Sequence, residues 1–496
     1  MKLADTTQTL WFKAAFVTLA SLLAIVFGLI AITHNPIFIG LAVGMVLGVF
    51  LLATPKVTIW LVIVLGLGSP ALLDMLGHGF SRMLWAISML ALLLWLPGIF
   101  NLFSLNPQHK KETPLFIWLA IIFAMFAVIT TALQLHSVGE LMGGFKRYFQ
   151  AFGLMLALAT LAFSRKDFNY WLKLVFVIAL LQLPFALFER FVLVPLRGGI
   201  ALAGGEATDV VAGTMGANLQ GGSPNAIMVV FVLTAFAFVV ARWKEKLIAT
   251  SSMLWLSLLL LLPLALGESK VVIVLLPLVS LILLAKDIQR EPAKFMPILL
   301  ALFGLTCVLA YVYIYLMLES TFAEALTGMW RYNVQDVGDG KLLLNRTTAL
   351  TFWAGLHGWF DPVALLFGHG LGSSYGAGFD AGHVAQLYQT HGINLTAVST
   401  MLWDLGLVGL SLYLSMFVAA WLQVGRMAKR STSALVKADC LAIKAGLAMT
   451  MVFLMYSDSQ VNLIVHEIII ALMLGYAAFM FQEQRAETTS GVQGQG

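Results

Sequence analysis

The sequence predicts an all-α polytopic integral membrane protein, and three observations support this fold class. Of the 496 residues, 60% are hydrophobic and only 11% are charged, whereas a soluble domain carries about 25% charged residues. The mean hydropathy is +0.93. Apolar runs long enough to cross a bilayer, about 17–25 residues each, recur along the whole chain.

About 14 apolar spans follow one another, and we expect each to form a transmembrane helix. They lie near residues 14–32, 36–53, 57–73, 83–103, 114–133, 148–163, 170–189, 224–241, 247–265, 270–285, 295–318, 396–425, 438–456 and 463–481. Residues 1–318 hold the first eleven spans and residues 396–482 the last three. Residues 483–496 form a tail that we expect to be disordered. No small-residue cleavage pattern follows the first span, so we expect no cleavable signal peptide.

The distribution of lysine and arginine predicts the orientation. With the N-terminus in the cytoplasm, 20 of the 29 Lys and Arg residues fall inside and nine fall outside. Cytoplasmic loops carry the excess of basic residues, so both termini are expected to be cytoplasmic, and the net charge of +5 gives no reason to invoke nucleic acid. As a set, the outer basic residues suggest an anionic ligand on the outer face. They are Arg82, Lys146, Arg147, Arg190, Arg197, Lys270, Arg331, Lys341 and Arg346.

Two outer loops are long. The first, residues 190–223, is rich in glycine and is followed by Pro224-Asn225, where we expect a helix to begin because proline suits the first turn. The second, residues 319–395, is the largest soluble piece. It is expected to carry one or two short amphipathic helices on the outer leaflet, with aromatic residues at headgroup level. These aromatic residues are Phe352, Trp353 and Trp359.

Polar residues gather where the second loop ends and the next span begins. His391 and Asn394 precede the span, and Asp404 lies within it. Asp404 is expected to act as a cap or to pair with Arg or Lys of another span rather than to act in catalysis, because polar groups at this depth line a cavity or find partners. The Gly-His-Gly-Leu-Gly run at 368–372 favours a turn over a phosphate cradle.

Four motifs follow one another in the C-terminal half, across about residues 210–425. They are GTMGANLQGGSPNAIMVVFVL, LLLLPLALGESKVVIVLLPLVSLILL, NRTTALTFWAGLHGWFDPVALLFGHGLGSS and HGINLTAVSTMLWDLGLVGL. Their order, with the long outer loop just before the histidine, resembles the O-antigen ligase and O-antigen polymerase superfamily of bacterial envelope glycosyltransferases. Two departures stand out. Ser269-Lys270 replaces the family's Ser-Arg pair, and Gly392 and Ile393 separate a His-Asn pair that is often adjacent in the family.

This resemblance implies a GT-C-like arrangement of helices in a bacterial inner membrane. It also implies transfer of a glycan from a polyprenyl diphosphate carrier to an acceptor hydroxyl on the periplasmic side. The acceptor hydroxyl must lose a proton as it attacks, and an imidazole near its ordinary pKa suits this role. His391 is therefore the expected base.

The diphosphate leaving group requires fixed cations, which stabilise the charge that grows on it. Arg346, Arg197 and Lys270 are the expected contacts, with Asn394, Asn225 and Ser269 in support. No Asp-x-Asp motif occurs in the chain, so we expect a site that uses neither a metal nor another cofactor.

Several alternatives stay open. A polysaccharide polymerase is slightly favoured over a ligase that uses lipid A core or a protein as acceptor, because the chain is long for a ligase and has two sizeable outer loops. A lipid-linked glycan flippase is less favoured, because transporters place ionisable sites near the bilayer midplane within inverted repeats, and no repeat is found here. A different carrier-lipid glycosyltransferase could use Asp74, near His78 and Arg82. For His466 and Glu467, a packed interhelical pair is favoured over a ligand role.

Overall fold

The computed structural model divides the chain into two compact units, residues 1–58 and 59–496. It describes residues 47–77, 83–103, 112–196, 210–217, 222–267, 269–293, 321–335, 342–358, 360–376 and 381–493, together with isolated positions between 296 and 315. In the first unit, the described residues are helical except for Thr54. The site described below lies within the second unit.

The described part of the chain is helical and contains no strand, which confirms the all-α prediction. Eight of its helices are long and apolar enough to cross a membrane, and they coincide with eight of the predicted spans. They cover Leu84–Leu102, Leu115–Leu133, Arg165–Leu196, Ser223–Lys244, Thr250–Gly267, Val272–Arg290, Ala397–Arg430 and Ile464–Glu487. The multi-pass membrane class therefore holds, while the count of 14 spans stays a prediction.

The other predicted spans have different outcomes. The span near 57–73 becomes α3, Pro55–Gly68, followed by the short helix α4, Pro70–Met75. The span near 438–456 becomes α22, Ala434–Phe453, whose length suits a crossing but which carries three charged residues. The spans near 14–32, 36–53 and 295–318 lie wholly or mostly outside the described residues.

The span predicted near 148–163 is not a single helix. Its residues divide between the end of α9, Val138–Phe149, and α10, Phe152–Thr160. Every residue of α10 except Phe152 is buried, so this short helix is enclosed by other helices. An apolar run buried in protein has the same composition as one that faces lipid, which explains the error in the predicted span.

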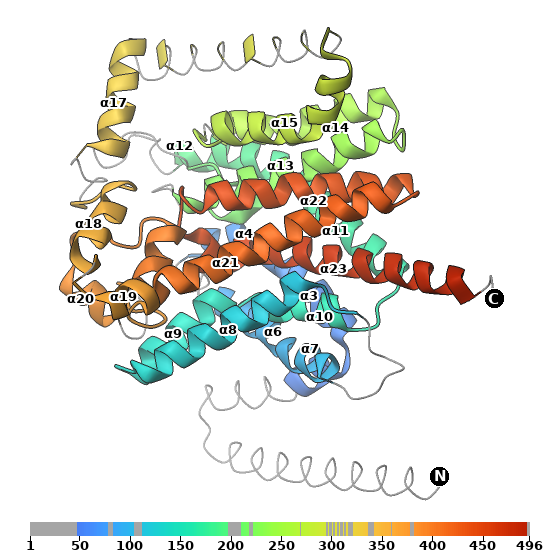
Figure 1. Ribbon diagram of the computed structural model, residues 1–496. Helices are drawn as coiled ribbons and strands as arrows, with labels where there is room; N and C mark the ends of the chain where they lie inside the picture. Colours follow the sequence, from blue (N-terminus) through green and yellow to red (C-terminus); the bar gives the residue numbers. More distant parts are fainter. Residues whose placement is uncertain are drawn as a thin grey trace, which may run out of the picture. The chain divides into compact units, whose positions relative to one another are not determined.

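Two helices form the centre of the second unit. They are α13, Ser223–Lys244, and α23, Ile464–Gln493, whose apolar windows are 78% and 89% buried. The helix α22 packs against α13, α23 and α21, Ala397–Arg430, and Figure 1 shows α21, α22 and α23 side by side. The expected start of a helix at Pro224-Asn225 is confirmed, because Pro224 lies in the first turn of α13.

The second predicted loop holds four short helices in its described part. They are α17, Phe322–Val334, α18, Thr348–His357, α19, Pro362–Phe367, and α20, His383–Leu387. The helices α18 and α19 pack against α21 (Figure 1). The expectation of Trp353 at headgroup level is wrong, because its side chain is buried in a cluster with Trp403. Trp359 lies outside the described residues.

Candidate functional site

The first part of the site is a glycine-containing turn held by one buried carboxylate. Asp404, in the first turns of α21, accepts hydrogen bonds from the Gly372 and Ser374 N–H groups at 3.2 and 2.8 Å. It also accepts from the Ser373 and Tyr148 hydroxyls at 2.8 and 3.0 Å. The expected turn at 368–372 is thus confirmed. Asp404 caps the backbone of this turn, which is one of the two roles expected for it.

The glycines of this turn are required by conformation and by space. Gly368, Gly370 and Gly372 have φ of +67°, +97° and +84°, values that L side chains rarely adopt. A Cβ at Gly368 would lie 2.4 Å from the Leu405 amide nitrogen, and one at Gly144 of α9 would lie 2.4 Å from the Leu371 carbonyl carbon. The turn therefore packs with its backbone directly against both α21 and α9.

One face of α9 binds this region through residues spaced at helical intervals. Glu140 contacts His383, Gly144 contacts the glycine turn, Arg147 lies over the Tyr375 ring at 3.2 Å, and Tyr148 donates to Asp404. Positions separated by three or four residues share a helix face. The helix α9 is therefore the element that positions the side chains of the site.

Four histidines form a continuous chain beside the turn. The His136 and His383 rings stack with centroids 3.6 Å apart, and the His383 and His369 centroids are 6.0 Å apart. His357 Nε2 and His369 Nε2 are 2.8 Å apart. Among the described residues, no group of three or more His, Cys, Asp or Glu side chains is arranged to hold a metal ion. The ring nitrogens of these histidines can donate and accept hydrogen bonds.

The positions of the ring protons on His357 and His369 follow from their hydrogen bonds. His357 Nδ1 lies 3.1 Å from the Trp353 carbonyl oxygen, so this nitrogen carries the proton and donates. In the neutral ring, His357 Nε2 is then the acceptor, and His369 Nε2–H donates to it. Burial, helped by the neighbouring histidines, lowers the pKa of His369 to about 4, so His369 is neutral at pH 7.

His383 is the histidine whose ring is oriented by an acid. Its Nδ1 lies 2.9 Å from Glu140 Oε1, and its backbone N–H donates to Glu140 Oε2 at 3.2 Å. Glu140 is buried. A carboxylate that accepts from Nδ1–H fixes the tautomer and leaves Nε2 able to accept a proton. This pair has the arrangement that general-base catalysis requires.

The second part of the site is the polar segment, residues 456–462 (YSDSQVN), which joins α22 to α23. Ser457 Oγ lies 3.0 Å from Ser223 Oγ at the start of α13, and the Ser457 carbonyl accepts from the Ala397 N–H at the start of α21. The Asn462 carbonyl accepts from Gln150 Nε2 at 3.2 Å. The polar segment therefore ties the starts of two spans to the turn between α9 and α10.

Two arginines approach the polar segment from elements far apart in the sequence. Arg346, just before α18, donates from Nε to the Tyr456 carbonyl at 2.8 Å and lies over the Tyr456 ring at 4.8 Å. Burial lowers the pKa of Arg147 in α9. Asp404 and Asp458 are near enough to oppose this shift with their negative charges. Lys146 precedes Arg147 in α9, and burial lowers its pKa to about 8. We call Lys146, Arg147 and Arg346 the cationic cluster.

His391 lies close to Arg346 along the backbone, because its carbonyl accepts from the Leu344 N–H at 3.0 Å. Its ring stacks on Phe352 with centroids 5.2 Å apart. Nδ1 is buried without a hydrogen-bond partner among the described residues, so Nε2 is the nitrogen that reaches the surface. Asn394 accepts at its carbonyl from Thr400. Neither residue has an orienting acid in the described part of the chain.

The other predicted site residues form a separate group at the start of α13. Asn225 is buried and donates from Nδ2 to the Val211 and Gly267 carbonyls, both at 2.7 Å. Ser269 Oγ is buried without a partner among the described residues. Within the described chain, no contact joins Lys270 to Arg346 or His391. Arg197 lies outside the described residues.

Several residues of the site escaped the sequence analysis. Arg147 and Lys146 were noted only among the outer basic residues, and the four histidines and Glu140 were not singled out. The polar segment carries a usable signal, because five of its seven residues are polar between two apolar spans. Glu467 accepts from Gln150 Nε2 and the Ala151 N–H, which confirms the interhelical contact expected for it. Asp74 accepts from the Ala217 N–H at 3.0 Å and so holds backbone, while His78 and Arg82 lie outside the described residues.

No sequence model of a known protein family matches the chain, and no curated protein is significantly similar to it.

Proposed function

We propose that this protein is a membrane-embedded glycosyltransferase that moves a glycan from a polyprenyl diphosphate carrier to an acceptor hydroxyl. The proposal depends on one observation: Arg147 and Arg346, which come from distant elements, approach the same polar segment at one end of the bundle. Guanidinium groups bind phosphate oxygens through two parallel hydrogen bonds. Two of them at the end of a membrane bundle suit a lipid-linked diphosphate.

Glycosyl transfer from a diphosphate carrier requires that negative charge be stabilised in a site with little water. When the sugar–phosphate bond breaks, negative charge grows on the diphosphate oxygen that leaves, and preorganised cations stabilise it most in a desolvated site. Arg147 and Lys146 are desolvated enough for burial to lower both pKa values. This cationic cluster would supply the charge stabilisation that a metal ion supplies in metal-dependent glycosyltransferases.

Two histidines are candidates for the group that takes the proton from the acceptor hydroxyl. The resemblance nominates His391, which lies beside the Arg346 backbone. The geometry nominates His383, because Glu140 orients its ring. We assign the proton acceptor to His383, with Glu140 as its positioning residue, and treat His391 as the competing assignment.

The most suitable member of this class is a polymerase of O-antigen or an exopolysaccharide, in a bacterial inner membrane with the site facing the periplasm. A ligase that transfers the glycan to lipid A core or protein shares the same diphosphate site. A flippase would need no group that activates an acceptor hydroxyl. The Glu140–His383 pair suits that role and so favours an enzyme.

The test uses purified protein with a short polyprenyl diphosphate glycan. A ladder of longer carrier-linked glycans indicates a polymerase, whereas transfer only after addition of lipid A core indicates a ligase. Arg147→Lys and Arg346→Lys are expected to lower the transfer rate about tenfold or more, because lysine keeps the charge and loses the fork. Arg331→Lys, at an exposed position of α17, is the matched control and should leave the rate unchanged.

The proton acceptor is tested in the same assay. His383→Ala should abolish transfer, and Glu140→Gln should lower its rate and displace the pH profile, since the ring then loses its charged partner. If His391→Ala abolishes transfer and His383→Ala does not, the base is His391. No product from any acceptor, with carrier movement across a vesicle membrane, would return the flippase to first place.

A further inference from the structure

A cavity lies at the other end of the bundle from the polar segment. It has a volume of about 560 Å³ and lies among α11, Arg165–Phe188, α13, α22 and α23. Its lining takes in residues between 168 and 177 of α11 and between 231 and 242 of α13. Because α13 begins at the polar segment, the cavity is near the opposite membrane face. By the predicted orientation, this face is cytoplasmic.

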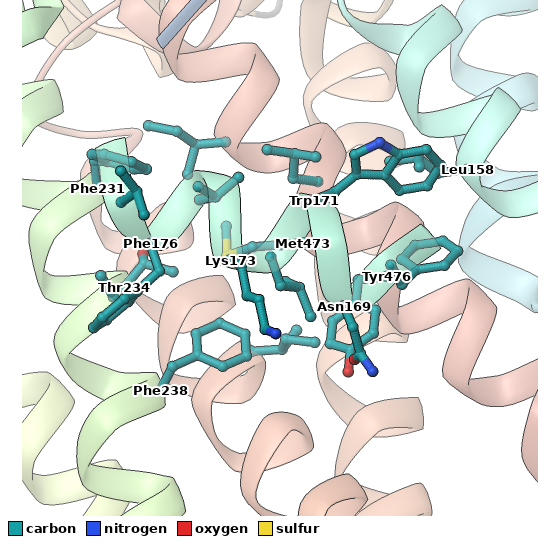
Figure 2. A pocket seen from close by; sticks show the side chains of 18 of the residues that line it. Leu158, Asn169, Trp171, Lys173, Phe176, Phe231, Thr234, Phe238, Met473 and Tyr476 are labelled. Carbon is teal, nitrogen blue, oxygen red and sulfur yellow. The ribbon is translucent and has the colours of Figure 1, made fainter. Parts of the chain in front are cut away.

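The walls of the cavity are apolar and face the lipid side of the bundle. Figure 2 shows Leu158, Trp171, Phe176, Phe231 and Phe238 along them. Only 28% of the apolar window of the α11 span is buried, and Val177 in the lining is 52% exposed. Exposed apolar residues of a membrane span contact acyl chains, and each methylene that the cavity buries contributes about 0.8 kcal/mol.

The polar residues of the lining leave one positive charge uncompensated. Arg242 donates from Nε and Nη2 to Asp439 at 2.9 and 3.1 Å, and Tyr476 donates to the same carboxylate. Arg242 is therefore neutralised. Lys173 is exposed, and its ammonium group has no acidic partner among the described residues. The lining of the cavity contains no Asp or Glu among the described residues.

We propose that this cavity binds one acyl chain of an anionic glycerophospholipid whose headgroup phosphate lies against Lys173. Lys173 is one of the lining residues, and Figure 2 shows its side chain among the aromatic walls. Basic pockets between spans at the cytoplasmic face suit anionic headgroups. The lipid site is independent of the proposed glycosyl transfer, because its residues are distinct from the cationic cluster and the histidines.

The test is native mass spectrometry of the purified chain with phosphatidylglycerol or phosphatidylcholine. The unmodified protein should retain phosphatidylglycerol in preference to phosphatidylcholine. Lys173→Gln should weaken that retention about fivefold, the effect of one basic residue at a membrane surface. Lys166→Gln, on the same helix and outside the lining, is the matched control and should retain as much as the unmodified protein.

A second pair of variants tests the acyl-chain position. Val177→Trp places a large side chain in the lining at an exposed position and should weaken retention of both lipids. Leu181→Trp, which is 42% exposed and outside the lining, should not. Equal retention of the two lipids by the unmodified protein, or equal losses in Lys173→Gln and Lys166→Gln, would overturn the proposal. Displacement of phosphatidylglycerol by a polyprenyl phosphate would overturn the phospholipid assignment.

Discussion

The turn at 368–375 and the segment at 211–217 are held in the same way and have different surroundings. Asp404 binds two backbone N–H groups of the first. Glu189 binds the Ala212 and Gly213 N–H groups of the second at 2.9 and 2.7 Å. All residues of 211–217 are buried. Thr214 there bonds to Gln182 and to the Leu67 carbonyl.

The two segments differ in the side chains that they place beside other ionisable groups. The turn at 368–375 brings His369 into the histidine chain and Tyr375 against Arg147. The segment at 211–217 uses its polar groups internally and fills space between helices. Glycine content and a holding carboxylate therefore do not mark a site by themselves. Ionisable groups left beside a fixed turn are the better indication.

The largest expected effect is the loss of the carboxylate that holds the turn. Asp404→Ala removes the acceptor of two N–H groups and two hydroxyls, which leaves buried donors unsatisfied. We expect a loss of about 3–5 kcal/mol in unfolding free energy. Glu189→Ala should lose less, about 2–3 kcal/mol. Thermal unfolding in detergent measures both.

Limited proteolysis distinguishes a local effect from a global one. Asp404→Ala should expose residues 360–395 to cleavage before the membrane core unfolds, and Glu189→Ala should leave that region protected. If Glu189→Ala is the more destabilising variant, the segment at 211–217 depends more on its carboxylate than the turn at 368–375 does, which contradicts the expected order.

The sequence predicted the parts of the fold that depend on local composition. Eight spans, the helix start at Pro224 and the turn at 368–372 each follow from residues close together in the chain. The Glu140–His383 contact could not be predicted, because the two residues are 243 positions apart and no local pattern links them. Trp353 was misplaced because an aromatic residue in an outer loop can pack in a small core as readily as at a headgroup.

The site residues show the same division. Arg346 and His391 were proposed from motif order, and the backbone contact at Leu344 brings them near each other. Lys270 was proposed on equal grounds and lies with the separate group at the start of α13. Motif order along the chain does not fix which outer ends meet, because that depends on how the spans pack.

A smaller effect is expected from the glycines that allow the turn to approach α21. Gly368→Ala requires a left-handed residue with its Cβ 2.4 Å from a backbone nitrogen, and strain of this kind costs about 1–3 kcal/mol. Gly355→Ala, inside α18 with nothing within 4 Å of the added Cβ, should stabilise by about 0.5–1 kcal/mol. Equal unfolding temperatures for the two variants would contradict the packing described.

The dependence of stability on pH again sets the turn apart. The pKa of His369 is lowered from 6.5 to about 4 by burial and by its histidine neighbours. Between these values the unfolded chain binds more protons than the folded chain, so stability falls as the pH drops through this window. We expect the loss to be about 1–2 kcal/mol, because His369 is half-buried and solvent screens part of the shift. His369→Gln should flatten the dependence of unfolding temperature on pH between 6.5 and 4.

Asp458 of the polar segment supplies the opposite slope. Burial raises its pKa from 3.8 to about 6, so in this window the folded chain binds more protons and stability falls as the pH rises. Asp458→Asn should therefore gain more stability relative to the unmodified protein at pH 7 than at pH 5, while His369→Gln should gain more at pH 5 than at pH 7. Two variants with slopes of the same sign would show that the turn and the polar segment do not differ in charge environment as the structure indicates.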